Sequence, residues 1–146
     1  MHQEVRQLEW QDDFSVGVQE IDNQHKKIIG FINSLNETLG TPDFVQTQMN
    51  ILREMTDYAE YHFGTEEKYF DLFDYEDSAE HKKLHDVYED KVGEFEKRLA
   101  LLDSDNINER TLFALDLMGF LEDWWVQHIL HSDKQYMACF KEHGLK

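Results

Sequence analysis

The chain contains four long stretches in which apolar residues recur every three or four positions, and histidine or carboxylate residues fall within each apolar series. Such spacing lines up one apolar face along a helix, so the sequence predicts four amphipathic helices. Polar groups on those faces point into the interior, where each unpaired group costs roughly 1–3 kcal/mol. The sequence therefore predicts helices packed around a shared polar site.

A Gly-Thr-Pro turn separates the first two predicted helices. The first is expected over about residues 20–39. The second is expected over about residues 42–73, with Thr41 as its N-cap and Pro42 as its first residue, because proline is well accommodated at that position.

The last two predicted helices also begin at polar caps. Asp77 or Ser78 should begin a helix that ends near residue 101, and Asn106 or Asn108 should begin one that ends near residue 143. Gly144 is expected to stop the last helix, because glycine readily adopts the left-handed conformation found at helix C-termini.

Four long helices joined by short loops predict an all-α protein, an antiparallel up-down-up-down four-helix bundle with an extended N-terminal arm. We expect the whole chain of 146 residues to form a single domain, with the arm over residues 1–18 and the bundle over residues 19–144. The arm should lie across the ends of other elements, anchored by Trp10. Leu112 and Leu115 are expected on the core side of the fourth helix.

The chain is strongly acidic, with a formal net charge of −17 and a pI near 4.6. Nucleic acids and anionic membrane surfaces attract basic patches, so this charge argues against both as partners. No run of about 20 apolar residues indicates a membrane span, and the N-terminus does not resemble a signal peptide. The single cysteine, Cys139, excludes an internal disulfide and fits a reducing compartment, so a cytoplasmic protein is expected.

The polar residues on the predicted apolar faces form a candidate metal-ligand set. His62 and Glu66 are four residues apart and share one helix face, as do His81 and His85 on the next helix. Mixed imidazole and carboxylate ligands suit iron, with zinc or manganese possible from ligand type alone. The complete set is His25, His62, Glu66, His81, His85, His128 and Asp133.

Each of these residues has an ordinary interpretation when it is considered alone. A single interior histidine such as His25 is more often a hydrogen-bonded structural residue, and carboxylates are commonly solvated in a chain with 31 acidic residues. The coincidence of all seven on inward faces favours metal binding, because burial without metal would leave several polar groups uncompensated. His2, His131 and His143 are interpreted as solvated or terminal residues.

The spacing of two candidate ligands constrains the fourth helix. His128 and Asp133 are five residues apart, which sets them about 140° apart on a regular α-helix. A π-type turn would bring both onto one face, and such turns are frequent at functional sites. We therefore predict either a local widening near residues 128–133 or an extended reach of the Asp133 side chain. Glu67, by contrast, is expected about 100° around its helix from Glu66, so Glu67→Ala should have little effect.

The motifs together resemble those of the hemerythrin family, of the bacterial single-domain type, and the similarity covers nearly the whole chain. The motifs that carry it are Gly17-Val18, Ile21-Asp22, Gln24-His25-Lys26, His62-Phe63-Gly64-Thr65-Glu66-Glu67, His81-Lys82-Lys83-Leu84-His85, and Trp124-Trp125-Val126-Gln127-His128-Ile129 with Asp133 and Tyr136.

The resemblance implies two iron ions that cycle between Fe²⁺ and Fe³⁺ and share an oxo or hydroxo bridge. His81, His85 and His128 would hold one ion. His25 and His62 would hold the other. The carboxylates of Glu66 and Asp133 would bridge the pair. Three imidazoles against two would leave one iron with an open position, which a small molecule needs in order to bind.

By the same resemblance, dioxygen would bind reversibly at the open position, and azide or similar small anions would bind the oxidised form. Apolar and aromatic side chains should line this position and exclude water, which slows irreversible oxidation. The predicted lining residues are Ile28, Phe63, Tyr88, Trp124, Trp125 and Ile129.

Trp125 departs from the family pattern, in which Trp-Leu usually precedes the fourth-helix histidine. In one interpretation it only fills space in the core. In the other it narrows the path to the open iron and donates a hydrogen bond from its indole N–H.

Reversible dioxygen binding for storage, delivery or scavenging is the expected function, without enzyme activity or catalytic residues. The alternatives are an oxygen- or redox-sensing module and a di-iron peroxidase or nitric oxide-handling enzyme. The chain begins at Met1 and ends just after the last predicted helix, which disfavours a sensor with an attached output domain. A peroxidase would need an electron-donor surface or a cysteine near the irons, and Cys139 lies about two turns beyond Asp133. The sequence identifies no protein acceptor.

Overall fold

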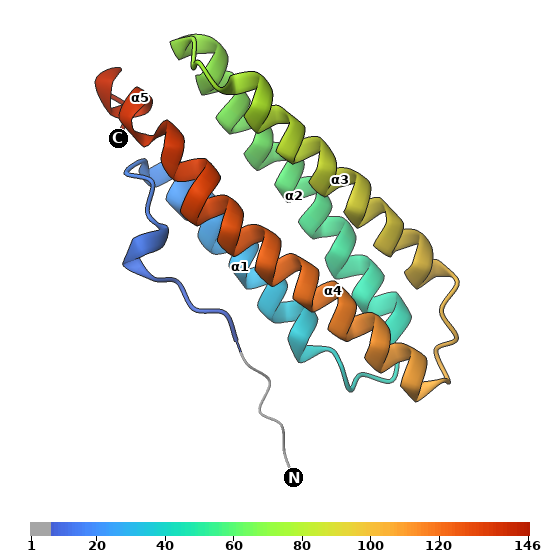
Figure 1. The fold of residues 1–146 in the computed structure, drawn as a ribbon. Coiled ribbons are helices and arrows are strands. Elements are labelled where there is room, and N and C mark those ends of the chain that lie inside the picture. The colour runs from blue at the N-terminus through green and yellow to red at the C-terminus, as the bar shows by residue number, and fades with distance from the viewer. Residues whose placement is uncertain (1–6) are drawn as a thin grey trace.

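The computed structural model describes residues 7–146, so the first residues of the N-terminal arm and His2 lie outside the described part of the chain. Within the described residues, four long helices run alternately up and down the bundle (Figure 1). The predicted all-α bundle with an N-terminal arm is therefore confirmed. The helices are α1 (Gln19–Glu37), α2 (Phe44–Phe73), α3 (Ser78–Ala100) and α4 (Ile107–Gln127).

The last predicted helix continues beyond α4 in three shorter segments rather than as regular α-helix to residue 143. A π-helical turn (His128–Asp133) follows α4 directly, and a 3₁₀ turn (Lys134–Tyr136) and the short helix α5 (Met137–Glu142) come after it. Gly144, at a φ of 75°, adopts the left-handed conformation and ends the segment, as predicted.

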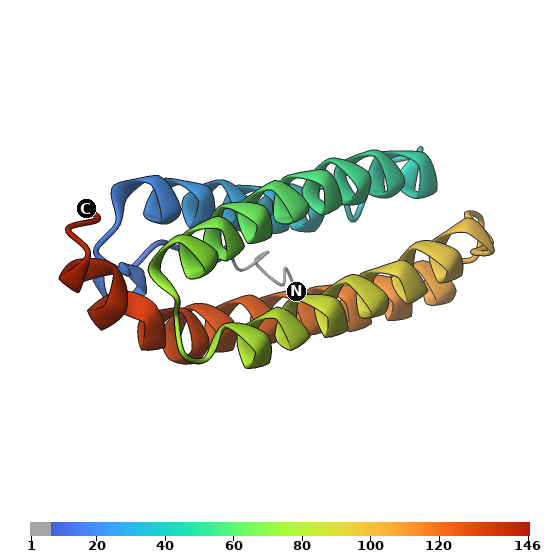
Figure 2. The same ribbon diagram turned by 90° about the horizontal axis from the view of Figure 1, so that it is seen from above.

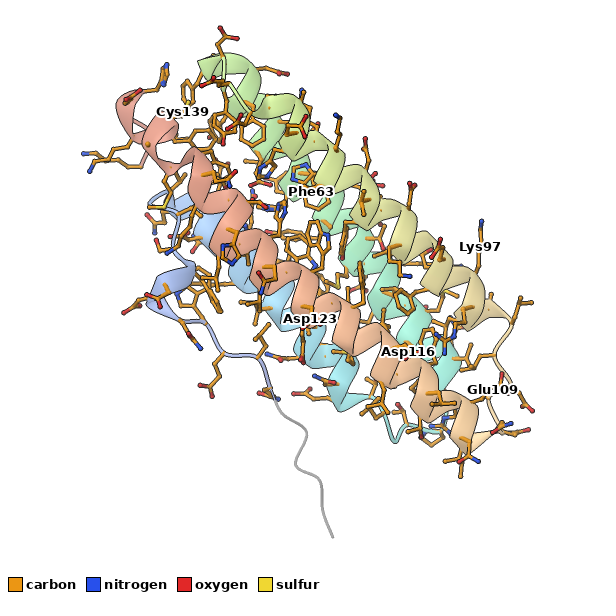
Figure 3. All side chains as sticks on the ribbon, viewed as in Figure 1. Phe63, Lys97, Glu109, Asp116, Asp123 and Cys139 are labelled. Carbon is orange, nitrogen blue, oxygen red and sulfur yellow. The ribbon has the colours of Figure 1, made fainter. Side chains whose placement is uncertain are left out.

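Consecutive helices lie side by side, and α4 returns to contact α1, so the four helices surround one core (Figure 2). Side chains divide accordingly: Phe63 lies between the helices, whereas Lys97 and Asp116 lie on the outside (Figure 3). The buried residues of α1 follow the predicted stripe and include Ile21, Ile28, Ile32 and Leu35. No helix within residues 7–146 combines the length and the apolar character needed to cross a membrane.

The turn between α1 and α2 differs from the prediction. Asp43 occupies the N-cap position of α2, and the Thr41 hydroxyl donates a hydrogen bond back to the carbonyl oxygen of Thr38. Thr41 and Pro42 therefore belong to the turn. The buried side chain of Gln48 donates to Thr38 Oγ1 at 2.6 Å and to the Leu35 carbonyl oxygen at 2.9 Å, and so ties the end of α1 to α2. α1 ends at Glu37, earlier than predicted.

Two leucines that were predicted on the core side of α4 are exposed. Leu112 keeps 59% of its surface accessible and Leu115 keeps 65%, whereas Phe113 is fully buried. The Phe113 ring meets Phe44 and Phe95 edge-on, at centroid distances of 6.4 and 6.1 Å. The larger aromatic ring takes the interior position because it buries more apolar area, and this rotates the helix face relative to the prediction.

The N-terminal arm runs along the side of α1 rather than across the ends of the helices. The Leu8 N–H and carbonyl pair with the side chain of Asn33 at 2.8 and 2.9 Å. Phe14 is buried in the core of the bundle, whereas Trp10 is only half-buried, so Phe14 rather than Trp10 is the anchor. The 3₁₀ turn that carries Phe14 (Asp12–Phe14) contacts the π-helical turn, and the arm thus supports that turn from outside.

Candidate metal centre

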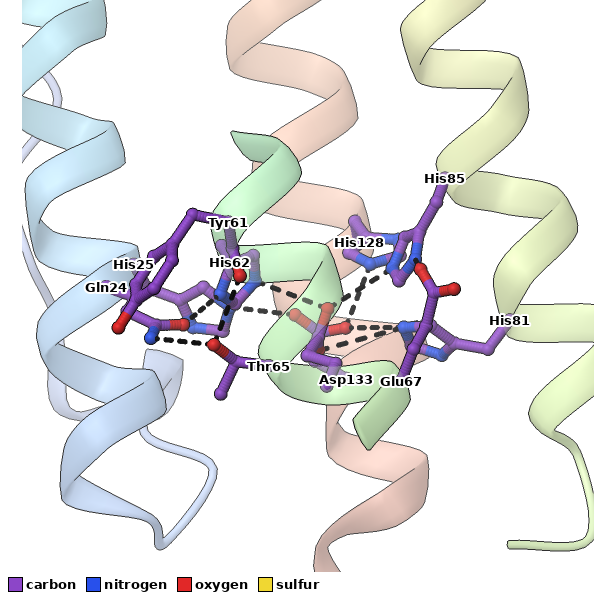
Figure 4. Close-up of polar contacts among 11 residues, drawn as sticks. Gln24, His25, Tyr61, His62, Thr65, Glu67, His81, His85, His128 and Asp133 are labelled. Atoms are coloured by element: carbon purple, nitrogen blue, oxygen red, sulfur yellow. Dashed lines mark hydrogen bonds and ion pairs between the residues drawn. The ribbon is translucent and has the colours of Figure 1, made fainter. Parts of the chain in front are cut away.

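Each long helix or its continuation contributes to one polar cluster in the core (Figure 4). One histidine comes from α1, a histidine and a glutamate from α2, two histidines from α3, and a histidine and an aspartate from the two ends of the π-helical turn. All seven side chains are at most 4% exposed. The structure therefore brings together the whole candidate ligand set: His25, His62, Glu66, His81, His85, His128 and Asp133.

Asp133 lies between histidines from three different elements. Its Oδ2 atom is 2.9 Å from Nε2 of His25. Its Oδ1 atom is 3.0 Å from Nε2 of His81 and 2.9 Å from Nε2 of His128. The two oxygens of one carboxylate thus face opposite sides of the cluster, which is the arrangement that a bridging ligand requires.

Glu66 also contacts histidines on both sides of the cluster. Its Oε1 atom lies 3.3 Å from Nε2 of His62, on the same helix, and 3.2 Å from Nε2 of His85, on α3. Its other oxygen, Oε2, is 3.8 Å from Nε2 of His81. Glu66 is accordingly close enough to share both of the sites described next.

The ligand atoms form two overlapping groups, in each of which every atom lies within 4.8 Å of the others. We call the first the three-histidine half; it contains Glu66 with His81, His85 and His128. We call the second the two-histidine half; it contains Glu66 and Asp133 with His25 and His62, whose Nε2 atoms are 3.1 Å apart.

These distances fit a metal-binding arrangement. Ligand atoms that lie about 2.1 Å from one ion and at right angles to each other are about 3 Å apart, close to the observed spacing of Nε2 and carboxylate atoms. The carboxylate oxygens of Glu66 and Asp133 are buried and form no hydrogen bond of normal geometry, and the same holds for three of the Nε2 atoms. Buried polar atoms without such partners are rare, and metal ions would satisfy them.

The π-helical turn places Asp133 in the cluster. It spans His128–Asp133, the segment in which the sequence predicted a local widening, and that prediction is confirmed. The wider turn brings residues five apart nearly onto one helix face, so both side chains point at the same centre. Their contact of 2.9 Å would be inaccessible on a regular α-helix, where they would diverge by about 140°.

The environment keeps both carboxylates ionised. Burial raises the pKa of Glu66, but the imidazole of His62 and other histidines outweigh burial and hold the pKa well below its ordinary value. Burial and the charge of Glu66 raise the pKa of Asp133, but His128 and His25 outweigh both and lower it. Burial lowers the pKa of His62 and so favours its neutral form. Ionised carboxylates and neutral imidazoles are the forms that bind metal ions.

The ring of His62 is oriented by a chain of hydrogen bonds behind it. Its Nδ1 atom lies 2.7 Å from Oε1 of Gln24, and the amide nitrogen of Gln24 donates to Oγ1 of Thr65 at 3.1 Å. The Thr65 hydroxyl in turn donates to the carbonyl oxygen of Tyr61. Because this chain fixes the amide, the proton of His62 lies on Nδ1 and its Nε2 lone pair faces the centre.

The ring of His85 is oriented by a carboxylate instead. Its Nδ1 atom donates to Oε2 of Glu67 at 3.1 Å. Glu67 was not predicted to make this contact. Its side chain does leave the inward face of α2 and is 34% exposed, but the neighbouring helix α3 brings His85 within its reach.

Aromatic rings cover the three-histidine half. Phe63 stacks on His85 with ring centroids 3.8 Å apart and an interplanar angle of 11°. Trp124, which is half-buried, stacks on His128 at 4.3 Å and 13°. These rings limit rotation of the two imidazoles and exclude water from their faces.

Trp125 lies close to a histidine of each half, His62 and His128. It is fully buried, stacks on Phe63 at 5.6 Å, and its ring centroid is 5.9 Å from that of His62. The hydroxyl of Tyr88 lies beside the indole, yet neither that hydroxyl nor the indole N–H makes a hydrogen bond of normal geometry. Burial raises the pKa of Tyr88, so its hydroxyl stays protonated. Ile28 and Ile129, the remaining predicted lining residues, are buried in the same core.

Tyr136 was predicted on the core side of its helix but was not assigned to the site. Its hydroxyl is fully buried, and burial together with the charges of Asp133 and Glu66 raises its pKa well above the ordinary value. It therefore remains a protonated donor beside the carboxylates of Asp133 and Glu66. The signal for this residue was its position three residues after Asp133, which places it one helical turn away.

The remaining histidines of the described chain lie outside the cluster. His131 and His143 are exposed, in agreement with the prediction. His143 stacks on Phe73 at 4.4 Å, and its Nδ1 atom is 4.0 Å from Sγ of Cys139.

Comparisons with known proteins match most of the chain. The hemerythrin HHE cation binding domain matches residues 16–140. A bacteriohemerythrin from Clostridium acetobutylicum is 31% identical over 131 residues, which cover 88% of this chain and 97% of the relative. A bacteriohemerythrin from Pseudomonas aeruginosa is 32% identical over 134 residues, which cover 92% and 82%. The crystal structure of a wild-type hemerythrin has a TM-score of 0.77 at 29% identity and covers 92% of this chain and 98% of that one.

The charge balance of the cluster predicts how the metal-free chain responds to pH. Burial lowers the pKa of His81, but Asp133 and Glu66 outweigh burial and raise it from 6.5 to about 9. A raised pKa stabilises the folded state fully below pH 6.5, and this contribution is lost as the pH rises through 9. We expect the free energy of unfolding of the metal-free chain, measured by urea denaturation, to fall between these two pH values.

Two comparisons test whether His81 causes this decline in the free energy of unfolding. His81→Gln should remove most of the decline, because the titrating group is gone, and a saturating divalent metal ion should also remove it, because the ion takes the place of the proton. A flat profile in the metal-free chain, or an undiminished decline in His81→Gln, would contradict the prediction.

Proposed function

The chain belongs to the hemerythrin family, whose members bind dioxygen at non-haem iron, and we propose that it binds dioxygen reversibly at a pair of iron ions. In this proposal Glu66 and Asp133 would bridge the ions together with an oxo or hydroxo group. The histidines of the three-histidine half would hold one ion, and His25 and His62 would hold the other. Azide and similar small anions would bind the same open position in the oxidised form.

The observation that carries the proposal is the unequal number of histidines in the two halves. In the three-histidine half, three imidazoles, two carboxylates and an oxo or hydroxo group would offer one ion six ligands. In the two-histidine half, two imidazoles with the same carboxylates and oxo or hydroxo group would offer five. Only an ion in the second half would then keep a position for a small molecule, as catalytic metal sites do.

Two ferrous ions held here would supply the two electrons that reversible binding of dioxygen requires. The residues around the site favour release of dioxygen over its irreversible reduction. Five imidazoles and two carboxylates bring less negative charge than the four carboxylates of oxygen-activating di-iron bundles, so the oxidised ions are less stabilised. The aromatic residues around the site keep water and stray protons from the bound ligand.

We propose that Trp125 and Tyr88 donate hydrogen bonds to a ligand or water at the open position. Trp125 is buried close to His62, Tyr88 is buried against Trp125, and each carries a donor without a hydrogen bond of normal geometry. A ligand or ordered water between them and the site would accept a hydrogen bond from the indole N–H or the tyrosine O–H.

Neither alternative function has a comparable observation behind it. The cysteine that a peroxidase would need, Cys139, lies on α5 and contacts the exposed His143 rather than the seven-residue cluster. Hemerythrins typically bind oxygen without catalysing a reaction, and the proposal extends this to the present chain.

Reversible oxygenation of the loaded protein tests the proposal. The chain should take up about two ferrous ions without oxygen, develop a visible absorption band in air, and lose that band when oxygen is removed, over repeated cycles. Uptake of a single ion, or irreversible conversion to the oxidised form in the first cycle, would contradict the proposal.

Trp125→Leu tests whether the indole restricts access. The smaller side chain opens the space beside His62 and removes the N–H, so azide should enter the oxidised site several-fold faster and the autoxidation rate should change by a similar factor. Stopped-flow absorbance and the decay of the oxygenated band measure the two rates. Leu112→Ala, a change at an exposed position of α4, is the control. If Trp125→Leu is folded and fully iron-loaded with both rates unchanged, Trp125 only fills the core.

A further inference from the structure

The two halves of the centre differ in the groups that accept a hydrogen bond from the Nδ1 atoms of their histidines. On the two-histidine half, Nδ1 of His62 donates to the neutral amide of Gln24 at 2.7 Å. On the three-histidine half, Nδ1 of His85 donates to the carboxylate of Glu67 at 3.1 Å. Both rings therefore carry their proton on Nδ1, and the acceptors differ in charge.

This difference changes how strongly each ring donates to a metal ion. A carboxylate draws the Nδ1 proton toward itself and raises the electron density at Nε2, which makes the imidazole a better ligand. A neutral amide has a weaker effect. His85 is 2% exposed, so little solvent screens this hydrogen bond at its imidazole end, although Glu67 itself is 34% exposed.

The number of imidazoles also favours tighter metal binding by the three-histidine half. The half that receives the charged partner also has three imidazoles, whereas the half with the neutral partner has two. No observed contact offsets this on the two-histidine half, where Nδ1 of His25 is buried and forms no hydrogen bond.

We propose that Glu67 is a positioning residue that acts through His85 to make the three-histidine half the tighter metal site, so that two ions enter and leave the centre in a fixed order. The inference rests on the proposed function only in requiring that the centre binds two divalent ions. Dioxygen binding is not needed for it.

Competition between the protein and a chelator tests the proposal. The full chain is loaded with Co²⁺, and the ions retained are counted by elemental analysis as chelator is added, while the cobalt absorption spectrum reports the ligand environment. The wild-type chain should lose its two ions in two separate steps. In Glu67→Gln the later step should move to a chelator concentration about 10- to 100-fold lower, as for other changes to the partner of a ligating histidine. The earlier step should stay within about 2-fold.

A matched control separates the hydrogen bond from the loss of one negative charge. Glu60 lies exposed on the same helix, so Glu60→Gln removes the same charge and should leave both steps in place. Circular dichroism checks that each variant is folded. Equal shifts in Glu67→Gln and Glu60→Gln, or equal shifts of both steps in Glu67→Gln, would overturn the proposal.

A second background tests whether Glu67 acts through His85. In His85→Ala the hydrogen bond is absent, so adding Glu67→Gln should change neither step. If Glu67→Gln lowers the affinity for cobalt further in this background, Glu67 does not act through His85, and the proposal is overturned. Uptake of fewer than two cobalt ions by the wild-type chain would contradict both this inference and the proposed function. Ordered release of two ions without reversible oxygenation contradicts the proposed function alone.

Discussion

The burial of two carboxylates among five imidazoles is the constraint on which the rest of the structure depends. Glu66 and Asp133 are both 0% exposed and stay ionised, so the core contains negative charge that must be balanced. Every long helix or its continuation therefore has to present a histidine at the level of these carboxylates. This requirement fixes the register of the four helices more strictly than apolar packing does, because apolar cores tolerate exchange of similar residues.

The apolar parts of the bundle hold this polar layer from both sides. One cluster extends toward the loop between α1 and α2 and includes Phe44, Phe113 and Leu99. The other joins the N-terminal arm to the C-terminal segment and includes Val16, Phe70 and Phe140. The arm also contacts the π-helical turn, an irregular segment that has to hold Asp133 in place. The N-terminal arm thus packs against the π-helical turn, which places Asp133 where a regular helix would not.

The sequence predicted which polar side chains meet in the core better than it predicted the edges of the fold. Pairs four residues apart, such as His81 and His85, share a helix face whatever surrounds them, and a spacing of five already indicated a widened turn. The position of Glu67 was not predictable in this way, because its partner lies on another helix. Likewise, Leu112 and Phe113 compete for one interior position, and only the rings across the core decide between them.

Diffraction from crystals of the iron-loaded chain, recorded at the iron absorption edge, would locate the metal ions directly. We expect two anomalous peaks per chain, about 3.5 Å apart, with Glu66 and Asp133 between them. One peak should adjoin His81, His85 and His128, and the other should adjoin His25 and His62. A single peak, or a pair of peaks that leaves Asp133 outside the coordination of either ion, would contradict the proposed centre.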